Sequence, residues 1–403
     1  MSAPNRWLIA IAGVFMQVAL GAVYAWSVFR IPLTKAHGWT ISQVTLVFQV
    51  TIFIVGFAAF VGGLWMRRSG PRPVALTAAV LYGAGTALAG TVSGLSALYL
   101  TYGVIAGTGL GFGYIIPIAT LVKWFPDKRG LITGLAVAGF GSGALVTAPV
   151  ANSLIASVGV GHTFEILGCA YFVVVFLCAL TMRNPPPGYK PAGYDPQSAA
   201  NLARASREFS FREALGTWQW YGLWLTLFLN TTAGIAIISQ ASPMAQEISG
   251  VSAATAAGLV GLISIANGSG RFLWAWLSDA VGRRAVFLAM FLVQSVAFYL
   301  LAGAHDFGML SLFACLILLC YGGGFGTMPA FVADYFGSAQ IAPIYGLMIT
   351  AWGFAAAFGP TVVATIREAT GRYEGAMRVL AVATLVSAVL PLLLRPPKVP
   401  AAR

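Results

Sequence analysis

Long apolar segments that alternate with short polar turns are the feature that most restricts how this chain can fold. Windows of about 20 apolar residues are long enough to cross a bilayer as helices. Twelve such windows lie at roughly 7–31, 42–66, 73–92, 96–122, 131–156, 162–182, 218–241, 253–277, 284–303, 307–333, 341–366 and 374–395. Because lipid offers no partner for backbone N–H and C=O groups, spanning segments of this kind form helices. The sequence therefore predicts an all-α membrane protein with twelve transmembrane helices.

The composition agrees with a membrane protein and argues against a nucleic-acid-binding protein. Only 8% of the 403 residues are charged and 59% are hydrophobic, whereas a soluble domain has about 25% charged residues. The net charge of +12 is in itself compatible with nucleic-acid binding. The basic residues, however, fall in short runs between apolar spans. We therefore expect the lipid bilayer, and no nucleic acid, as a partner.

The distribution of Lys and Arg predicts the orientation. Seventeen of the 23 basic residues fall on the side that holds both chain ends, five fall on the other side, and Arg271 falls within a span. Basic residues are enriched in cytoplasmic loops. We expect both termini in the cytoplasm and a multi-pass protein of the cell inner (plasma) membrane.

The longest polar stretch, Arg183–Gly216, separates six spans from six. It predicts an N-terminal six-helix bundle at 1–182, a cytoplasmic linker at 183–216 with a short surface helix near Glu208–Leu215, and a C-terminal six-helix bundle at 217–403. Similar basic, glycine-containing turns follow the second span (63–72) and the eighth span (276–284). Parallel six-helix repeats predict a transporter with its site between the halves, near the middle of the membrane.

The turn Asp279-Ala-Val-Gly-Arg-Arg284 resembles the signature loop of the major facilitator superfamily. The first copy departs from it because Arg67 stands where the family usually has Asp, so its usual charge contact is not expected there. The segments 21–27, 123–130 and 334–337 resemble the oxalate/formate antiporter family, which is related to the monocarboxylate transporters. This resemblance covers essentially the whole chain and implies organic-anion transport by alternating access.

Arg271 is the principal candidate for a functional residue. It lies inside the otherwise apolar or small-residue segment Thr255–Leu277, and a guanidinium cannot lose its charge. A charge at this depth is unfavourable and is usually functional, which indicates a bound anion. The alternative is that the side chain extends to the interface, since Asp279 is only about 12 Å away along a helix.

The resemblance assigns Arg271 to substrate binding and also limits the substrate. The oxalate exchangers have a second intramembrane cation, a lysine in span 11, and the matching position here is Trp352. One buried cation favours a substrate with one carboxylate, such as lactate, pyruvate or formate.

Further site residues follow from helical spacing and from the resemblance. Asn267 lies four residues before Arg271, on the same helix face. The resemblance implies substrate contacts for Tyr114, Tyr24, Tyr321 and Phe325, and places Phe140 where the oxalate exchangers have a tyrosine. Leu145 is a weaker candidate nearby. For the aromatic residues, ordinary packing between helices is the alternative.

The coupling mechanism stays open between two possibilities. No acidic residue falls deep in a span, and Asn267 stands where the proton-coupled animal monocarboxylate transporters have Asp. Resemblance to bacterial monocarboxylate carriers favours proton symport of a short monocarboxylate such as L-lactate or pyruvate, and the alternative is anion exchange of the oxalate/formate type. The sequence contains neither a His-Glu-x-x-His motif nor a Gly-x-Ser-x-Gly motif. We expect no enzyme activity, no cofactor, no metal site and a monomer.

Overall fold

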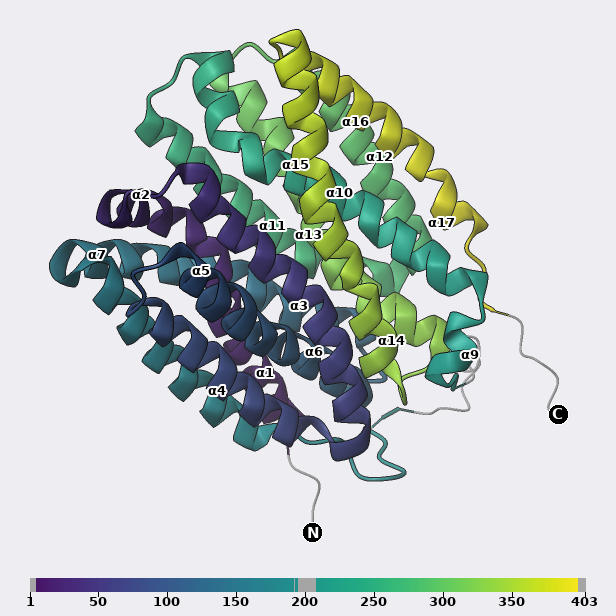
Figure 1. Ribbon diagram of the computed structural model, residues 1–403. Coiled ribbons are helices and arrows are strands. Elements are labelled where there is room, and N and C mark those ends of the chain that lie inside the picture. Colours follow the sequence, from purple (N-terminus) through teal and green to yellow (C-terminus); the bar gives the residue numbers. More distant parts are fainter. Residues whose placement is uncertain (1–4, 192, 195–207, 398–403) are drawn as a thin grey trace.

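A computed structural model describes residues 5–191, 193–194 and 208–397, and all regular elements in these ranges are helical (Figure 1). The N-terminal group of helices contains α1 (Arg6–Leu20), the 3₁₀ turn η1 (Gly21–Ala25), α2 (Trp26–His37), α3 (Ile41–Ser69), α4 (Pro71–Ala89), α5 (Leu95–Leu98), the π-helical turn η2 (Tyr99–Ala106), α6 (Gly107–Trp124) and α7 (Arg129–Thr181).

The C-terminal group contains α9 (Phe211–Leu215), α10 (Trp218–Ser249), α11 (Ala253–Val281), α12 (Arg283–Leu301), α13 (Phe307–Phe336), α14 (Ile341–Met348), α15 (Thr350–Thr370), α16 (Glu374–Ser387) and α17 (Val389–Leu393). The helix α9 agrees with the surface helix expected near Glu208–Leu215. Part of the expected linker, 195–207, lies outside the described residues.

The two repeated turns have the same backbone geometry. Gly70 ends α3 with φ +77°, and Gly282 ends α11 with φ +92°. A positive φ of this kind strains any residue with a Cβ, which explains glycine at both places. Each turn leads directly into the next helix, α4 or α12, so the similarity seen in the sequence corresponds to a similarity in structure.

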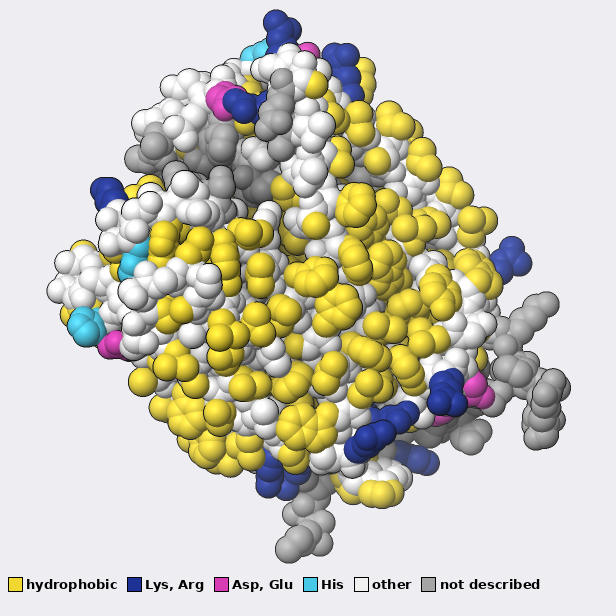
Figure 2. Space-filling view, viewed as in Figure 1, with side chains coloured by type: hydrophobic (Ala, Val, Ile, Leu, Met, Phe, Trp, Pro, Cys, Tyr) yellow, Lys and Arg dark blue, Asp and Glu magenta, His cyan; other side chains and the backbone are white. Residues whose placement is uncertain are grey.

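Nine helices within the described ranges are long and apolar enough to cross a membrane. One of them, α7, contains a non-helical residue, Gly159, with φ +83° and ψ 168°. This break falls between the predicted spans 131–156 and 162–182. The helices α4 and α11 are not among the nine, so the expected twelve spans stay a prediction. Figure 2 shows hydrophobic side chains across the middle of one face and basic side chains toward its ends, as a lipid-facing surface requires.

Both ends of the described chain lie at one end of the bundle, which we call the basic end. Arg6 pairs with Asp127 in the α6–α7 turn at 2.6 Å. Arg284, at the start of α12, donates from Nε to the carbonyl oxygen of Pro391 at 2.8 Å. The first and last helices therefore terminate beside the turns that carry most of the arginines.

Carboxylates of the C-terminal group join the two groups at the basic end. Asp279 accepts hydrogen bonds from the backbone N–H groups of Gly130 (3.1 Å) and Leu131 (2.9 Å), at the start of α7. Asp334 pairs with Arg129 of the N-terminal group at 3.1 Å and with Arg283 at 2.9 Å. A carboxylate at a helix N-terminus is favoured by the helix dipole. These contacts close the basic end.

The first copy of the turn makes a different contact, as its sequence predicts. Arg67 donates to the side-chain oxygen of Gln340 at 3.2 Å. A carboxylate of the linker binds the residues just before α14. Glu208 accepts from the backbone N–H groups of Ser338 (3.1 Å) and Ala339 (2.8 Å). Arg67 stands where a carboxylate is usual in the first turn, and Glu208, which precedes α9, supplies a carboxylate in this region instead.

Glycines allow α11 to lie very close to its neighbours. A Cβ at Gly322 or Gly326 of α13 would overlap the carbonyl oxygens of Asn267 and Arg271, respectively. On the opposite side, a Cβ at Gly134 of α7 would lie 2.7 Å from the Cβ of Ala275. Small residues permit this close packing in membrane bundles. The helix that carries Arg271 is therefore held between α13 and α7.

The contact between α7 and α11 is closed toward the basic end and open beyond the middle. A Cβ at Gly141 would lie 2.8 Å from the Cα of Gly268. Farther from the basic end, an added Cβ at Gly258 or Gly261 would have no heavy atom of the described residues within 4 Å, and Leu145 is 43% exposed. The two groups therefore diverge away from the basic end.

Gly326 lies against the backbone of α11, whereas Gly258 contacts no described neighbour, so these two glycines give a matched test of packing. We expect Gly326→Ala to lower the free energy of unfolding by about 1–3 kcal/mol, because its Cβ pushes α11 away from α13. Gly258→Ala should leave it unchanged or raise it by up to about 1 kcal/mol through helix propensity. Thermal unfolding of the purified variants in detergent measures both. Equal midpoints for the two variants would contradict the close approach of α11 and α13.

Candidate functional site

Arg271 is completely buried where the two groups of helices meet. Its Nε donates to the side-chain oxygen of Asn267 at 3.2 Å, Nη1 to the carbonyl oxygen of Val137 at 3.3 Å, and Nη2 to the hydroxyl of Tyr24 at 3.2 Å. Two of these three acceptors belong to the N-terminal group. The side chain therefore points into the protein and does not extend to the membrane interface.

The charge of Arg271 has no acidic counterpart among the side chains that the structure describes. The ion pairs in these ranges involve Arg6, Arg129, Arg283, Arg367 and His162 instead. A guanidinium has five N–H donors, so the three acceptors leave donors for a ligand. A buried charge without a partner is strongly destabilising, which makes this position suited to binding an anion.

Aromatic rings surround the guanidinium. Its central carbon lies 4.9 Å from the ring centre of Phe325, 5.5 Å from that of Phe140 and 5.9 Å from that of Tyr24. Ring faces attract cations, more strongly where water is excluded. The rings therefore offset part of the unfavourable burial of the charge.

These rings belong to one ring cluster that draws on both groups of helices. Its members are Tyr24 of η1, Tyr114 of α6, Phe140 of α7, Tyr321 and Phe325 of α13, and Trp352 of α15. Trp352 is central, with ring-centre distances of 5.3 Å to Phe325, 6.1 Å to Tyr24 and Phe140, and 6.4 Å to Tyr114.

Local backbone features position the cluster. Gly21 begins the 3₁₀ turn that carries Tyr24, and a Cβ at Gly21 would overlap the carbonyl oxygen of Phe140. The close approach of this turn to α7 places the rings of Tyr24 and Phe140 5.3 Å apart. In α6, the backbone carbonyl of Tyr114 accepts from the amide of the buried Gln17 at 3.1 Å, which fixes α6 against α1.

Several polar groups of the cluster are buried without hydrogen bonds. The hydroxyls of Tyr114 and Tyr321 and the indole N–H of Trp352 have no partner in hydrogen-bonding geometry within the described ranges, and all three residues are fully buried. Buried polar groups are nearly always satisfied in proteins, and each exception calls for an explanation. Donors that converge beside an unpaired guanidinium are suited to the oxygens of a ligand.

Most of the sequence-predicted residues come together here. Arg271 and Asn267 lie beside the ring cluster, which contains five further predicted residues, Tyr24, Tyr114, Phe140, Tyr321 and Phe325. Leu145 lies outside the cluster, exposed on the open part of the α7–α11 contact.

Two contributions to the site were not predicted. Trp352 was expected only to replace a cation, although its indole N–H is a polar group that the residue type itself indicates. The carbonyl of Val137 is a backbone group, and its residue type carries no signal of this contact.

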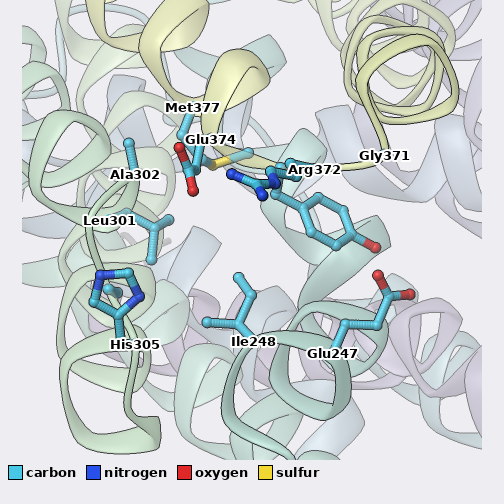
Figure 3. A pocket seen from close by; sticks show the side chains of 11 residues that line it. Glu247, Ile248, Leu301, Ala302, His305, Gly371, Arg372, Glu374 and Met377 are labelled. Atoms are coloured by element: carbon cyan, nitrogen blue, oxygen red, sulfur yellow. The ribbon is translucent and has the colours of Figure 1, made fainter.

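A cavity of about 230 Å³ lies away from Arg271, among Glu247, His305, Arg372, Tyr373 and Glu374 (Figure 3). Figure 3 shows Arg372 and Glu374 on one side and His305 and Glu247 on the other. Acids and bases are mixed here, and Glu247 already pairs with Arg367 at 2.6 Å. It therefore lacks the single uncompensated charge that distinguishes the surroundings of Arg271.

The unpaired charge of Arg271 can be tested without any ligand. We expect Asn267→Asp to raise the free energy of unfolding by about 1–3 kcal/mol, because it places a carboxylate beside the guanidinium. Asn230→Asp is the matched control, since Asn230 is also buried but donates to the side chain of Gln294 and the carbonyl of Cys320. That variant should be destabilised. Thermal unfolding in detergent near pH 7 measures both, and destabilisation of Asn267→Asp would contradict an unpaired charge at Arg271.

Comparison with known proteins agrees with this architecture. The Major Facilitator Superfamily model matches residues 7–275 and 223–403. The oxalate:formate antiporter of Oxalobacter formigenes is 28% identical over 389 residues, which cover 96% of this chain and 90% of the antiporter. Apicoplast pyruvate carrier 1 of Toxoplasma gondii is 27% identical over 346 residues, 71% of this chain and 63% of the carrier.

A solved structure shows the same fold. The crystal structure of the human organic anion transporter MFSD10 has a TM-score of 0.75 at 16% identity and covers 96% of this chain and 100% of that chain. The family match spans nearly the whole sequence and confirms the resemblance given by the turn at Asp279–Arg284. The chain therefore belongs to the Major Facilitator Superfamily of membrane transporters and is not an enzyme.

Proposed function

We propose that this protein is a secondary active transporter of short monocarboxylates, such as L-lactate or pyruvate, that works as a proton symporter by alternating access. It acts as a monomer in the inner membrane with both termini in the cytoplasm. The observation that carries the proposal is the fully buried Arg271 with no carboxylate partner among the described side chains. The relatives named as an oxalate:formate antiporter and a pyruvate carrier support an organic acid as substrate.

The composition of the site favours one carboxylate over two. Arg271 supplies a guanidinium, which binds a carboxylate through paired hydrogen bonds. The other side chains of the ring cluster are uncharged aromatic residues. A dianion would leave one charge buried among rings without a partner, which is strongly unfavourable. A short acid with one carboxylate and a small apolar tail avoids this penalty.

The closed and open contacts support alternating access between the bundles 1–182 and 217–403, joined by the linker 183–216. Asp279 and Asp334 hold the basic end closed, while α7 and α11 diverge at the other end. We infer that substrate reaches Arg271 from the divergent end. Release to the cytoplasm then requires the contacts of Asp279 with α7 and of Asp334 with Arg129 to break.

Symport requires the empty carrier to change conformation, which it can do only if Arg271 tolerates burial without substrate. In the structure, Asn267, Val137 and Tyr24 accept hydrogen bonds from the guanidinium and three rings lie around it. This partial compensation supports net symport. The missing acidic counterpart favours the alternative, anion exchange, because a ligand would then be needed for each transition.

Uptake of labelled L-lactate into proteoliposomes, with and without an inward proton gradient, tests the proposal. We expect gradient-driven uptake in the wild type and a loss of about 30-fold or more in Arg271→Ala, because a buried charge partner of the substrate is removed. Arg372→Ala removes an arginine that lines the cavity among Glu247, His305 and Glu374, outside the ring cluster, and serves as the matched control.

Competition by formate and oxalate completes the experiment. Inhibition by formate and little inhibition by oxalate would agree with a site for one carboxylate. Uptake that needs an internal anion and ignores the gradient would establish exchange in place of symport. Normal uptake by a folded Arg271→Ala variant would overturn the assignment of the site.

A further inference from the structure

Trp352 holds a buried polar group that makes no well-aligned hydrogen bond within the described structure. Its side chain is fully buried, its ring contacts rings from both groups of helices, and its Nε1–H has no acceptor in hydrogen-bonding geometry within the described ranges, although the Tyr321 hydroxyl lies close to it. An indole N–H is a donor only. It therefore cannot be satisfied by rotation in the way that a hydroxyl can, and only an acceptor placed beside it removes the unfavourable burial.

A second unsatisfied donor lies next to it. The hydroxyl of Tyr321 has no partner in hydrogen-bonding geometry within the described ranges, but it lies within reach of the indole N–H of Trp352 and of the Tyr24 hydroxyl, and near the charge of Arg271. The hydroxyl of Tyr24 in turn accepts from Arg271 at 3.2 Å. The donors of Trp352 and Tyr321 thus meet in one region, and that region adjoins the guanidinium.

We propose that Trp352 Nε1–H and the Tyr321 hydroxyl together bind the oxygen on carbon 2 of the substrate, while Arg271 binds its carboxylate. This inference rests on the proposed function and narrows its substrate class. In a 2-hydroxy or 2-oxo acid, one carbon–carbon bond separates the carbon of the carboxylate from the carbon that bears the second oxygen. Such an acid presents its acceptors side by side, as the guanidinium and the two donors are arranged here.

The arrangement divides recognition between the two groups of helices. Arg271, Tyr321 and Trp352 all belong to the C-terminal group, on α11, α13 and α15. They bind the polar edge of the acid. Tyr24 and Phe140 of the N-terminal group, whose rings are 5.3 Å apart, contact its apolar tail. An unsubstituted acid such as propionate has the same carbon skeleton but leaves both donors unsatisfied, and sites of this kind discriminate against an analogue that lacks the bonded group.

The test is the ratio of transport efficiency for L-lactate and pyruvate to that for propionate, measured in proteoliposomes. We expect the wild type to prefer the 2-oxygenated acids by about tenfold or more, and Trp352→Phe to lower that ratio by about tenfold, the effect of one lost hydrogen bond. Tyr321→Phe, which keeps its ring, should lower the ratio similarly. Propionate uptake should persist in both variants, which also shows that they fold.

Tyr345→Phe is the matched control. The hydroxyl of Tyr345 likewise has no partner in hydrogen-bonding geometry within the described ranges, but the hydroxyl that it lies close to is that of Tyr114, and it also feels the charge of Arg271. This variant should keep the wild-type ratio. An unchanged ratio in Trp352→Phe would overturn the inference. If Trp352→Phe does not fold, an unchanged ratio in Tyr321→Phe would overturn it instead. So would wild-type transport of propionate as efficient as that of L-lactate.

The inference and the proposed function fail in different ways. If the wild type carries L-lactate, pyruvate and propionate equally and all three depend on Arg271, only the role of Trp352 and Tyr321 is wrong. If none of the three acids is carried in an Arg271-dependent manner, the proposed function itself is wrong, and the inference is overturned with it.

Discussion

The burial of one permanent positive charge between two groups of helices determines most of what surrounds it. The guanidinium of Arg271 cannot release its proton, so its surroundings have to supply acceptors and ring faces. Asn267, Val137 and Tyr24 supply the acceptors, and Phe325, Phe140 and Tyr24 supply the rings. Glycines on α13 and α7 bring the backbone of α11 close to both neighbours. The close packing of the helices and the surrounding aromatic rings thus both help to accommodate the buried guanidinium of Arg271.

The basic end depends on carboxylates that approach the starts of helices, and the two repeats achieve this differently. Asp279, in the second copy of the turn, binds the first N–H groups of α7. In the first copy Arg67 contacts Gln340, and the carboxylate before α14 comes from Glu208. The segment between the two groups therefore contributes directly to the closure, in addition to connecting them.

The sequence predicted those site residues whose type is unusual in an apolar helix or whose contact is local in sequence. A charge in an apolar segment identifies Arg271, and helical spacing identifies Asn267, whose contact is local. The rings of Tyr24, Tyr114, Phe140, Tyr321 and Phe325 were suggested by family resemblance, since aromatic residues in apolar spans are otherwise indistinguishable from packing residues.

Other features depend on tertiary contacts that residue type does not indicate. The central place of Trp352, the carbonyl of Val137 and the exposure of Leu145 follow from how α7, α11 and α15 meet. The all-helical fold was predicted correctly because lipid leaves the backbone few alternatives. The break at Gly159 fell between two predicted spans, whereas the number of spans rests on hydropathy alone and stays a prediction.

The role of the buried guanidinium is tested most simply by equilibrium binding of labelled L-lactate to the purified protein. The wild type is compared with Arg271→Gln, which keeps a polar side chain without the charge. We expect saturable binding of one L-lactate per chain, displaced by pyruvate, and no measurable binding by a folded Arg271→Gln variant. Equal affinity of the two proteins for L-lactate would show that the buried guanidinium does not hold the carboxylate.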